Sequence, residues 1–185
     1  MAGRAPDLLT AIPTLDHVLE VHRATLGDDC VGYRHHTYRV VNLCLAQGED
    51  HGPDLVEKFA LAAAFHDLGI WTDGTFDYLP PSIRLARAYL SETGRGGWVP
   101  EVELTIEMHH KARRYRGPYE ALVEPFRCAD WVDVTRGVRR CGVPRATCTA
   151  ILAAWPSAGF HARLGSLFLR RLATHPWSPL PMFRV

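Results

Sequence analysis

The sequence predicts an all-α protein, built as one bundle of about seven or eight helices. In most segments, apolar residues recur at the three- and four-residue spacing of an amphipathic helix. No run rich in Val, Ile and Thr shows the alternation of a half-buried strand. The 185 residues fit one domain and can bury a sizeable core. We therefore expect residues 1–185 to form a single domain.

The first helix is expected to start after Thr14 and to stop near Gly27. Thr14 is a favourable N-cap residue, and apolar residues follow it at helical spacing. This segment also contains His17 and His22. Such histidines are more often partly exposed side chains than ligands, and we expect that of both.

The second helix should cover residues 33–47. His36 shares a stripe with Val40 and Leu43, whereas His35 points about 100° away from it. Two interpretations of His36 are open. It is either a core histidine hydrogen-bonded to a backbone carbonyl, or a metal ligand whose ring is held by the apolar face.

The third predicted helix is apolar all round. It opens at Pro53, where a missing N–H is harmless, and residues 59–65 are all apolar. His66 and Asp67 follow directly, and Gly69 should end the element. Because a helix without a polar face lies inside a bundle, these two side chains need a partner, and a cation would provide one.

An ordered loop is expected next, over residues 69–81. Its aromatic residues Trp71, Phe76 and Tyr78 can anchor it beside His66 and Asp67, as the wall or lid of a pocket. Two helices should follow, over residues 82–90 and 100–111.

The remaining segments are also predicted to be helical. A helix starting at Pro118 should run to residue 134 and kink at Pro125. Asp130 lies on the side of this helix that periodicity predicts to be buried, where a lone carboxylate needs a partner. Two closing helices are expected over 144–154 and 159–174, followed by an extended tail over 176–185.

Composition excludes several functional classes. The formal net charge is +1, so the chain lacks the basic field that nucleic-acid binding exploits. The five cysteines include no CxxC pair, which favours a reducing compartment. No apolar run approaches the ~20 residues that span a bilayer, and no signal peptide is apparent. We expect a cytoplasmic protein with a small-molecule substrate, no nucleic-acid or membrane partner, and possible homodimerisation.

The candidate ligands follow a recognisable order, namely His36, the His66–Asp67 pair and Asp130. This order resembles the HD superfamily of metal-dependent hydrolases over residues 33–135. The residues HTYRV at 36–40 resemble the HxxRV motif of the family. The residues AAAFHDLG at 62–69 resemble its central motif, and CADW at 128–131 resembles the motif of its last aspartate.

The resemblance implies an HD-like helical bundle and a metal-dependent phosphohydrolase that cleaves a small phosphate ester or nucleotide with a metal-bound water. The implied metal ligands are His36, His66, Asp67 and Asp130. Two imidazoles and two carboxylates suit Mn, Fe, Ni, Co, Zn or Mg. Four protein ligands leave positions open for water and substrate. We expect one metal ion.

Further roles are assigned around these ligands. The predicted catalytic residues are Asp67, His109, His110 and Asp73. The predicted substrate-binding residues are Lys111, Arg39, Trp71 and Asp133, with Arg39 also able to orient a ligand carboxylate.

The chain departs from the family at two points. Many nucleotide-cleaving relatives have an acidic residue where this chain has Ile70, so Asp73 or Asp77 would have to replace it. The GYP motif of the cyclic-dinucleotide phosphodiesterases is absent after His110. Two alternatives therefore stay open: an enzyme similar to cyanamide hydratase that acts on a small C–N substrate, and a sensor that binds metal or ligand without turnover.

Overall fold

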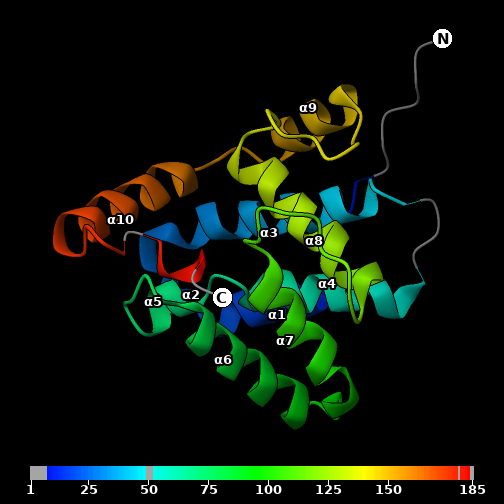
Figure 1. Cartoon of the computed structure of the whole chain (residues 1–185). Helices are drawn as coiled ribbons and strands as arrows, with labels where there is room; N and C mark the ends of the chain where they lie inside the picture. Colours follow the sequence, from blue (N-terminus) through cyan, green and yellow to red (C-terminus); the bar gives the residue numbers. More distant parts are fainter. Residues whose placement is uncertain (1–7, 49–51, 179, 184–185) are drawn as a thin grey trace.

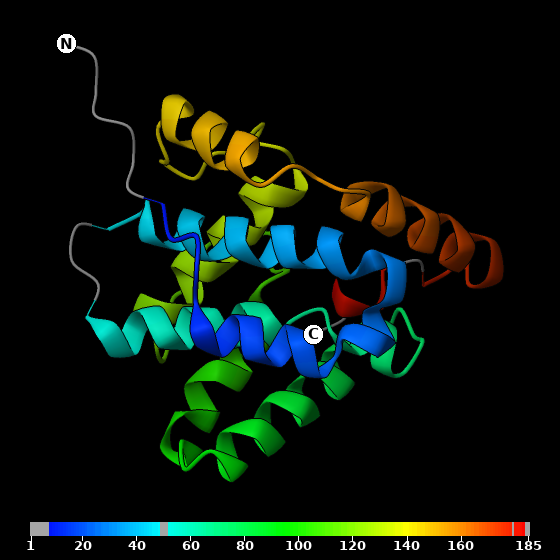
Figure 2. The same ribbon diagram turned by 180° about the vertical axis from the view of Figure 1, so that it is seen from behind.

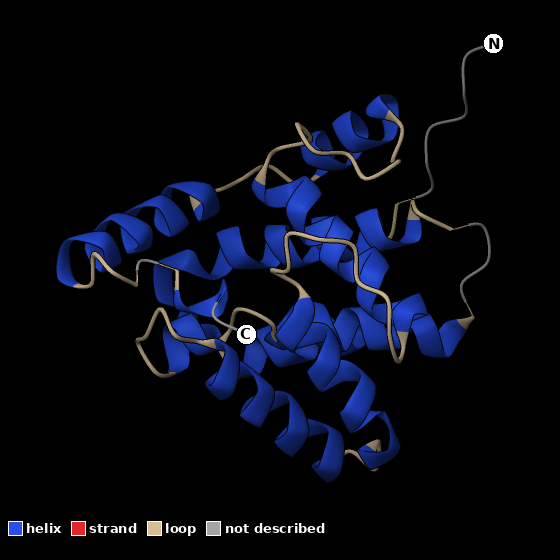
Figure 3. Ribbon diagram, viewed as in Figure 1, coloured by secondary structure: helices blue, strands red, loops and turns tan. Residues whose placement is uncertain are grey.

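The computed structural model describes residues 8–48, 52–178 and 180–183, and no strand occurs within these ranges (Figure 3). Eight helices of nine or more residues in the described ranges confirm the all-α prediction. They are α1 (Pro13–Val21), α3 (Cys30–Leu45), α4 (Pro53–Phe65), α6 (Leu79–Glu92), α7 (Val99–Met108), α8 (Glu120–Val134), α9 (Arg145–Ala154) and α10 (Phe160–Thr174). Shorter elements are α2 (Arg23–Leu26), α5 (Gly69–Thr72) and the 3₁₀ helices η1 (Gly27–Asp29), η2 (Gly96–Trp98) and η3 (Pro181–Phe183).

Helices α3, α4 and α8 form the centre of the bundle (Figure 1). Helix α3 packs against both α4 and α8, and α4 also contacts α1, α6 and α7. The pair α6 and α7 lies on one side of this centre, and α9 and α10 lie on the other, as the two opposite views show (Figures 1 and 2). Side chains from α3, α4, α7 and α8 can therefore meet inside the molecule.

Helix α4 is as buried as its sequence predicts. Every residue from Phe59 to Phe65 is at most 2 % exposed. Burying Phe59 and Phe65 stabilises the fold by about 1.5–3 kcal/mol each, and the alanines between them let the neighbouring helices approach closely. The C-terminal end of α4, with His66 and Asp67, is thereby fixed in the interior.

No helix in the described ranges combines the length and apolar character that a bilayer span needs.

The prediction of a loop over residues 69–81 is wrong at both ends. Gly69 begins α5 instead of ending the preceding element, and α6 starts at Leu79 rather than at residue 82. Pro80 and Pro81 fall in the first turn of α6, where a helix loses no hydrogen bond through the missing N–H. The two prolines thus start this helix, although a proline pair more often marks a loop.

Other expected boundaries also differ. The first predicted helix is divided into α1 and α2, and α3 begins at Cys30 rather than at residue 33. Thr14 is not the N-cap of α1, because Ile12 holds that position and the Thr14 hydroxyl bonds to the Glu57 carboxylate. Helix α8 begins at Glu120 instead of Pro118. The tail is not extended throughout, since residues 181–183 form η3 and Met182 is buried. Residues 179, 184 and 185, which also belong to the predicted extended tail, lie outside the described residues.

Replacing Gly69 with Ala is expected to lower the free energy of unfolding by about 1–3 kcal/mol, the range for overpacking. A Cβ at Gly69 would lie 2.5 Å from the Tyr78 carbonyl oxygen and 3.0 Å from the Ser82 nitrogen. The backbones of α5 and α6 would have to move apart to admit this Cβ. Urea denaturation of the variant and the wild type measures the resulting loss of stability. The control is Gly96→Ala, since a Cβ there meets no atom within 4 Å beyond its chain neighbours. Equal losses of stability in the two variants would contradict this packing.

Candidate metal centre

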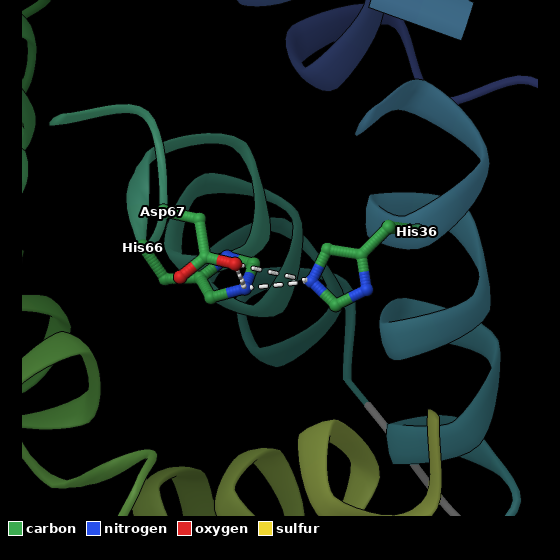
Figure 4. A group of neighbouring side chains, drawn as sticks. All are labelled: His36, His66 and Asp67. Atoms are coloured by element: carbon green, nitrogen blue, oxygen red, sulfur yellow. Dashed lines mark hydrogen bonds and ion pairs between the residues drawn. The ribbon is translucent and has the colours of Figure 1, made fainter. Parts of the chain in front are cut away.

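Four helices bring histidine and aspartate side chains together inside the bundle. His36 comes from the middle of α3 and Asp130 from α8, while His66 and His109 are the residues that directly follow α4 and α7. The ring of His36 is turned toward His66 and Asp67 (Figure 4). All five residues are at most 4 % exposed. Such burial of titratable groups is costly unless they pair or bind an ion.

The two histidines at helix ends are oriented by the same local interaction. Carbonyl groups in the last turn of a helix lack an intrahelical partner. The Nδ1–H of His66 donates to the Ala63 carbonyl at 2.8 Å, and the Nδ1–H of His109 donates to the Ile106 carbonyl at 2.6 Å. Each ring therefore presents the lone pair of its Nε2 atom to the interior.

His36 lies in the middle of a helix and uses a carboxylate instead of a carbonyl. Its Nδ1–H donates to Asp133 Oδ2 at 2.6 Å, so its Nε2 atom also presents a lone pair. The Nε2 atoms of His36 and His66 are 2.9 Å apart. Two lone pairs at this distance repel each other unless a proton or a cation lies between them. Metal-binding histidines show this arrangement, with one ring nitrogen inward and the other bonded outward.

Two carboxylates converge on the same pair of nitrogens. Asp67 Oδ2 lies 3.6 Å from the Nε2 atom of His36 and 3.3 Å from that of His66. Asp130 Oδ1 lies 3.7 Å and 3.9 Å from these two atoms. Ligand atoms held at ~2.1 Å around one cation stand roughly 3.0–3.4 Å apart, which is close to these separations. The four residues predicted as ligands thus lie together, and His36, His66 and Asp67 form a group that could hold a metal ion.

A second group of possible ligands shares Asp67 and consists of Asp67, His109 and His110. Asp67 Oδ1 and His109 Nε2 are 3.6 Å apart, and both are buried with no hydrogen-bond partner in the described part of the chain. Because buried polar atoms rarely stay unpaired, a cation that accepts lone pairs from both would resolve the cost. The residues therefore fit a divalent metal, and this nitrogen and oxygen donor set suits several divalent ions.

Burial and neighbouring groups shift the pKa values of the two inner carboxyl groups, Asp130 and Asp67, in opposite directions. Burial raises the pKa of Asp130 to about 8; His109 opposes this shift and Asp67 reinforces it. Burial also acts to raise the pKa of Asp67, but His66 and His109 outweigh it and hold that pKa well below its usual range. Burial lowers the pKa of His36 to about 4. Without a cation, Asp130 therefore carries a proton at neutral pH while His36 is neutral.

Asp133 and Arg39 form a buried ion pair behind His36. The Arg39 guanidinium donates to both Asp133 oxygens, with Nη2 at 2.9 Å from Oδ2, and its Nη1 donates to the Trp155 carbonyl at 2.9 Å. The pair is fully buried. Although burial opposes it, the hydrogen bond from His36 and the hydrogen bonds and charge of Arg39 hold the pKa of Asp133 well below its usual range. A permanently ionised Asp133 fixes the His36 ring and its tautomer.

A cavity of about 460 Å³ opens beside the inner carboxylates. Asp67, His110 and Asp130 contribute to its wall, so the cluster of candidate ligands is connected to a space that a small molecule can enter. Most other described residues of the wall are apolar or aromatic, and they include Phe76, Tyr78, Trp131, Leu164, Phe168 and Met182. The positions of Phe76 and Tyr78 in this wall confirm the prediction that the segment after Asp67 contributes aromatic side chains to a pocket.

The other predicted site residues are placed differently. His109 and His110 join the cluster, but Arg39 and Asp133 are buried behind it and do not line the cavity. Trp71 also lies outside the cavity wall, and its Nε1–H donates to Asp29 at 2.9 Å. Asp73 is exposed and pairs with Arg84. The backbone carbonyl of Lys111 accepts hydrogen bonds from Arg127 and Trp131, and Lys111 is not part of the described wall.

Two residues of the site were not among the predicted catalytic, substrate-binding or metal-binding residues, although Tyr78 was expected in the pocket wall. The Tyr78 hydroxyl bonds to His110 Nε2 at the cavity. The only signal in the sequence for Tyr78 is an aromatic residue shortly after the His66–Asp67 pair. His161 comes from α10, beyond the motifs, and its Nε2 lies 3.0 Å from the Asp133 carbonyl oxygen. No local pattern distinguishes His161 from an ordinary surface histidine.

Comparison with known proteins gives no assignment: no family model, curated protein or solved structure matches the chain.

Proposed function

We propose that this chain is a metal-dependent phosphohydrolase of the HD type, with one divalent cation held by His36, His66, Asp67 and Asp130. The observation that carries the proposal is the 2.9 Å approach of the His36 and His66 Nε2 atoms beside two carboxylates. A cation bound there would lower the pKa of a water molecule and polarise a phosphoryl oxygen. The substrate would enter through the cavity beside Asp67 and Asp130.

Other groups of the site would hold the histidine ligands in position and hold a proton near the leaving group. Asp133 and the Ala63 carbonyl hold His36 and His66 with their Nε2 atoms inward. Tyr78 and His110 are the candidates to hold a proton near the leaving group, because both line the cavity and are hydrogen-bonded to each other. Burial raises the pKa of Tyr78 well above its usual value and lowers that of His110 well below its own. Tyr78 therefore stays protonated, and its hydroxyl donates a hydrogen bond to the Nε2 atom of a neutral His110.

Tyr78 and His110 could replace the acidic residue that many nucleotide-cleaving relatives have at the position of Ile70. Ile70 is only 4 % exposed and provides no proton, and Asp73 is turned to solvent. Tyr78→Phe would keep the ring in the wall while removing the hydroxyl. The proposal places the proton near the leaving group on the hydrogen-bonded Tyr78 and His110, rather than on a carboxylate that follows His66 and Asp67 in the sequence.

The proposal is tested by turnover of a phosphoester panel in the presence of Mn, Co, Ni or Mg. The expected result is hydrolysis that depends on the added metal and stops with a chelator. Hydrolysis that continues unchanged after the metal has been removed would contradict it.

Metal affinity is expected to rise about tenfold from pH 6 to 7, about fivefold from pH 7 to 8, and then to level off. Below its pKa of about 8, Asp130 must lose a proton before its oxygen can bind a cation. The dissociation constant of Mn, measured by calorimetry at several pH values, checks this. Asp130→Asn is the control, because it should bind more weakly and with a shallower slope. A dissociation constant that does not change from pH 6 to 8 would contradict the assignment of Asp130.

A second candidate is hydration of a small C–N substrate, in the manner of cyanamide hydratase. The cavity favours it by one feature: Arg136 is the sole Lys or Arg among the described residues of its wall, and Phe76, Tyr78 and Trp131 are aromatic. Release of urea from cyanamide, measured beside the phosphoester panel, separates the two reactions. A cavity that admits a ligand fits the sensor alternative as well, and turnover in either assay separates an enzyme from a sensor that binds metal or ligand without reaction.

A further inference from the structure

The cavity beside the candidate metal centre has a polar end and an apolar end. Its polar end is formed by Asp67, His110 and Asp130, which the distances of the cluster place together. The rest of the wall extends to α10 and to the segment around η3, which lies close to α10 in the fold (Figure 1). The volume of about 460 Å³ falls within the ~300–1,000 Å³ of small-molecule sites. It also exceeds the ~150 Å³ that holds a benzene molecule.

Helix α10 presents apolar side chains to this space. Leu164 and Phe168 lie one turn apart, line the cavity and are only half-buried. Val134 of α8 and Leu180 also line it, and they remain 39 % and 38 % exposed. Apolar side chains that gather around a cavity without filling it gain free energy when an apolar group of a ligand covers them.

The same wall offers little to a highly charged ligand. Arg136 is the sole lysine or arginine among its described residues, and its side chain is exposed. His161 already contacts Ser157 Oγ at 2.7 Å and the Asp133 carbonyl. The sugar hydroxyls and further phosphates of a nucleotide would need several convergent polar partners, which the described wall does not supply.

We infer that the substrate combines a small reacting head group with an apolar aryl or branched-alkyl body, and that this body occupies the cavity between α8, α10 and η3. The inference rests on the proposed function for the position of the head group at Asp67 and Asp130. An aryl phosphate is the matching substrate class, and a nucleoside phosphate or a sugar phosphate is not.

The test compares 1-naphthyl phosphate with glycerol 2-phosphate as substrates, and measures binding of 1-naphthol, which has no phosphoryl group. We expect kcat/KM at least tenfold higher for the naphthyl ester. Leu164→Glu should lower that value and the affinity for 1-naphthol at least tenfold each. The matched control is Leu169→Glu on the same helix, because Leu169 is 63 % exposed and does not line the cavity. Phe168→Ala is a second cavity variant, in case Leu164→Glu does not fold.

The outcomes separate the inference from the proposed function. Binding of 1-naphthol that requires Leu164 and Phe168, without hydrolysis of either ester, would support the apolar site and refute the phosphohydrolase. Metal-dependent hydrolysis that is equal for both esters and unaffected by the cavity variants would support the phosphohydrolase and overturn the apolar site. Equal effects of Leu164→Glu and Leu169→Glu on 1-naphthol binding would also overturn it.

Discussion

Asp67→Asn is expected to lower kcat by about 10²- to 10³-fold and to lower the bound metal in proportion. Asp67 is the one residue shared by both groups of possible ligands, with Oδ2 near His36 and His66 and Oδ1 near His109. The substitution removes its charge at nearly constant volume. Electrostatic stabilisation by one group contributes several kcal/mol to a transition state, and each 1.36 kcal/mol is a factor of ten in rate. Initial rates and elemental analysis of the purified variant measure the two effects.

The matched control is Asp54→Asn, at the opposite end of the same helix. Asp54 is exposed in the first turn of α4, so its variant should keep both metal and activity. Full activity of Asp67→Asn in a protein with normal metal content would remove the basis for the proposed centre. Loss of activity in both variants would indicate a general effect on α4 instead.

Asp133→Ala is expected to reduce the free energy of unfolding by about 3–5 kcal/mol, the cost of leaving a buried charge without its partner. The stranded charge is Arg39, which is fully buried and bonded to both Asp133 oxygens. The same substitution removes the acceptor for the His36 Nδ1–H, so metal affinity should also fall by about 10- to 100-fold. Denaturant unfolding and metal titration measure the two changes.

The control for that prediction is Arg87→Ala. Arg87 forms an exposed ion pair with Glu103, and exposed pairs contribute about 0–1 kcal/mol. Its variant should unfold near the wild-type midpoint with unchanged metal affinity. If Asp133→Ala were no less stable than Arg87→Ala, the buried pair would not hold His36 as described.

Local patterns in the sequence were enough to find most of the helices and the buried histidine and aspartate residues of the candidate metal centre. His36 and Asp130 lie on apolar stripes, and His66 follows a wholly apolar helix, so burial could be predicted for each from its neighbours in the chain. The structure confirms that burial. Predicted boundaries were wrong where one residue type serves two roles, as at Pro80, which lies in the first turn of α6 instead of belonging to a loop.

Contacts between distant segments could not be predicted in this way. Arg39 was expected to contact substrate, but it is enclosed by Asp133 and by the carbonyl group of Trp155, 94 and 116 residues further along the chain. Trp71 is drawn away from the cavity by its bond to Asp29. The apolar end of the cavity depends on where α10 and η3 pack, and no local pattern encodes that position.

The proposed metal centre can be tested by the metal content of the purified protein after loading with Mn, Co, Ni or Zn and removal of free ions. We expect about one bound equivalent per chain in the wild type and almost none in a folded His66→Ala variant, because the inward Nε2 atom is lost. A folded wild-type protein that retains no metal under any of these conditions would contradict the presence of the centre. Equal metal retention by His66→Ala would contradict it as well.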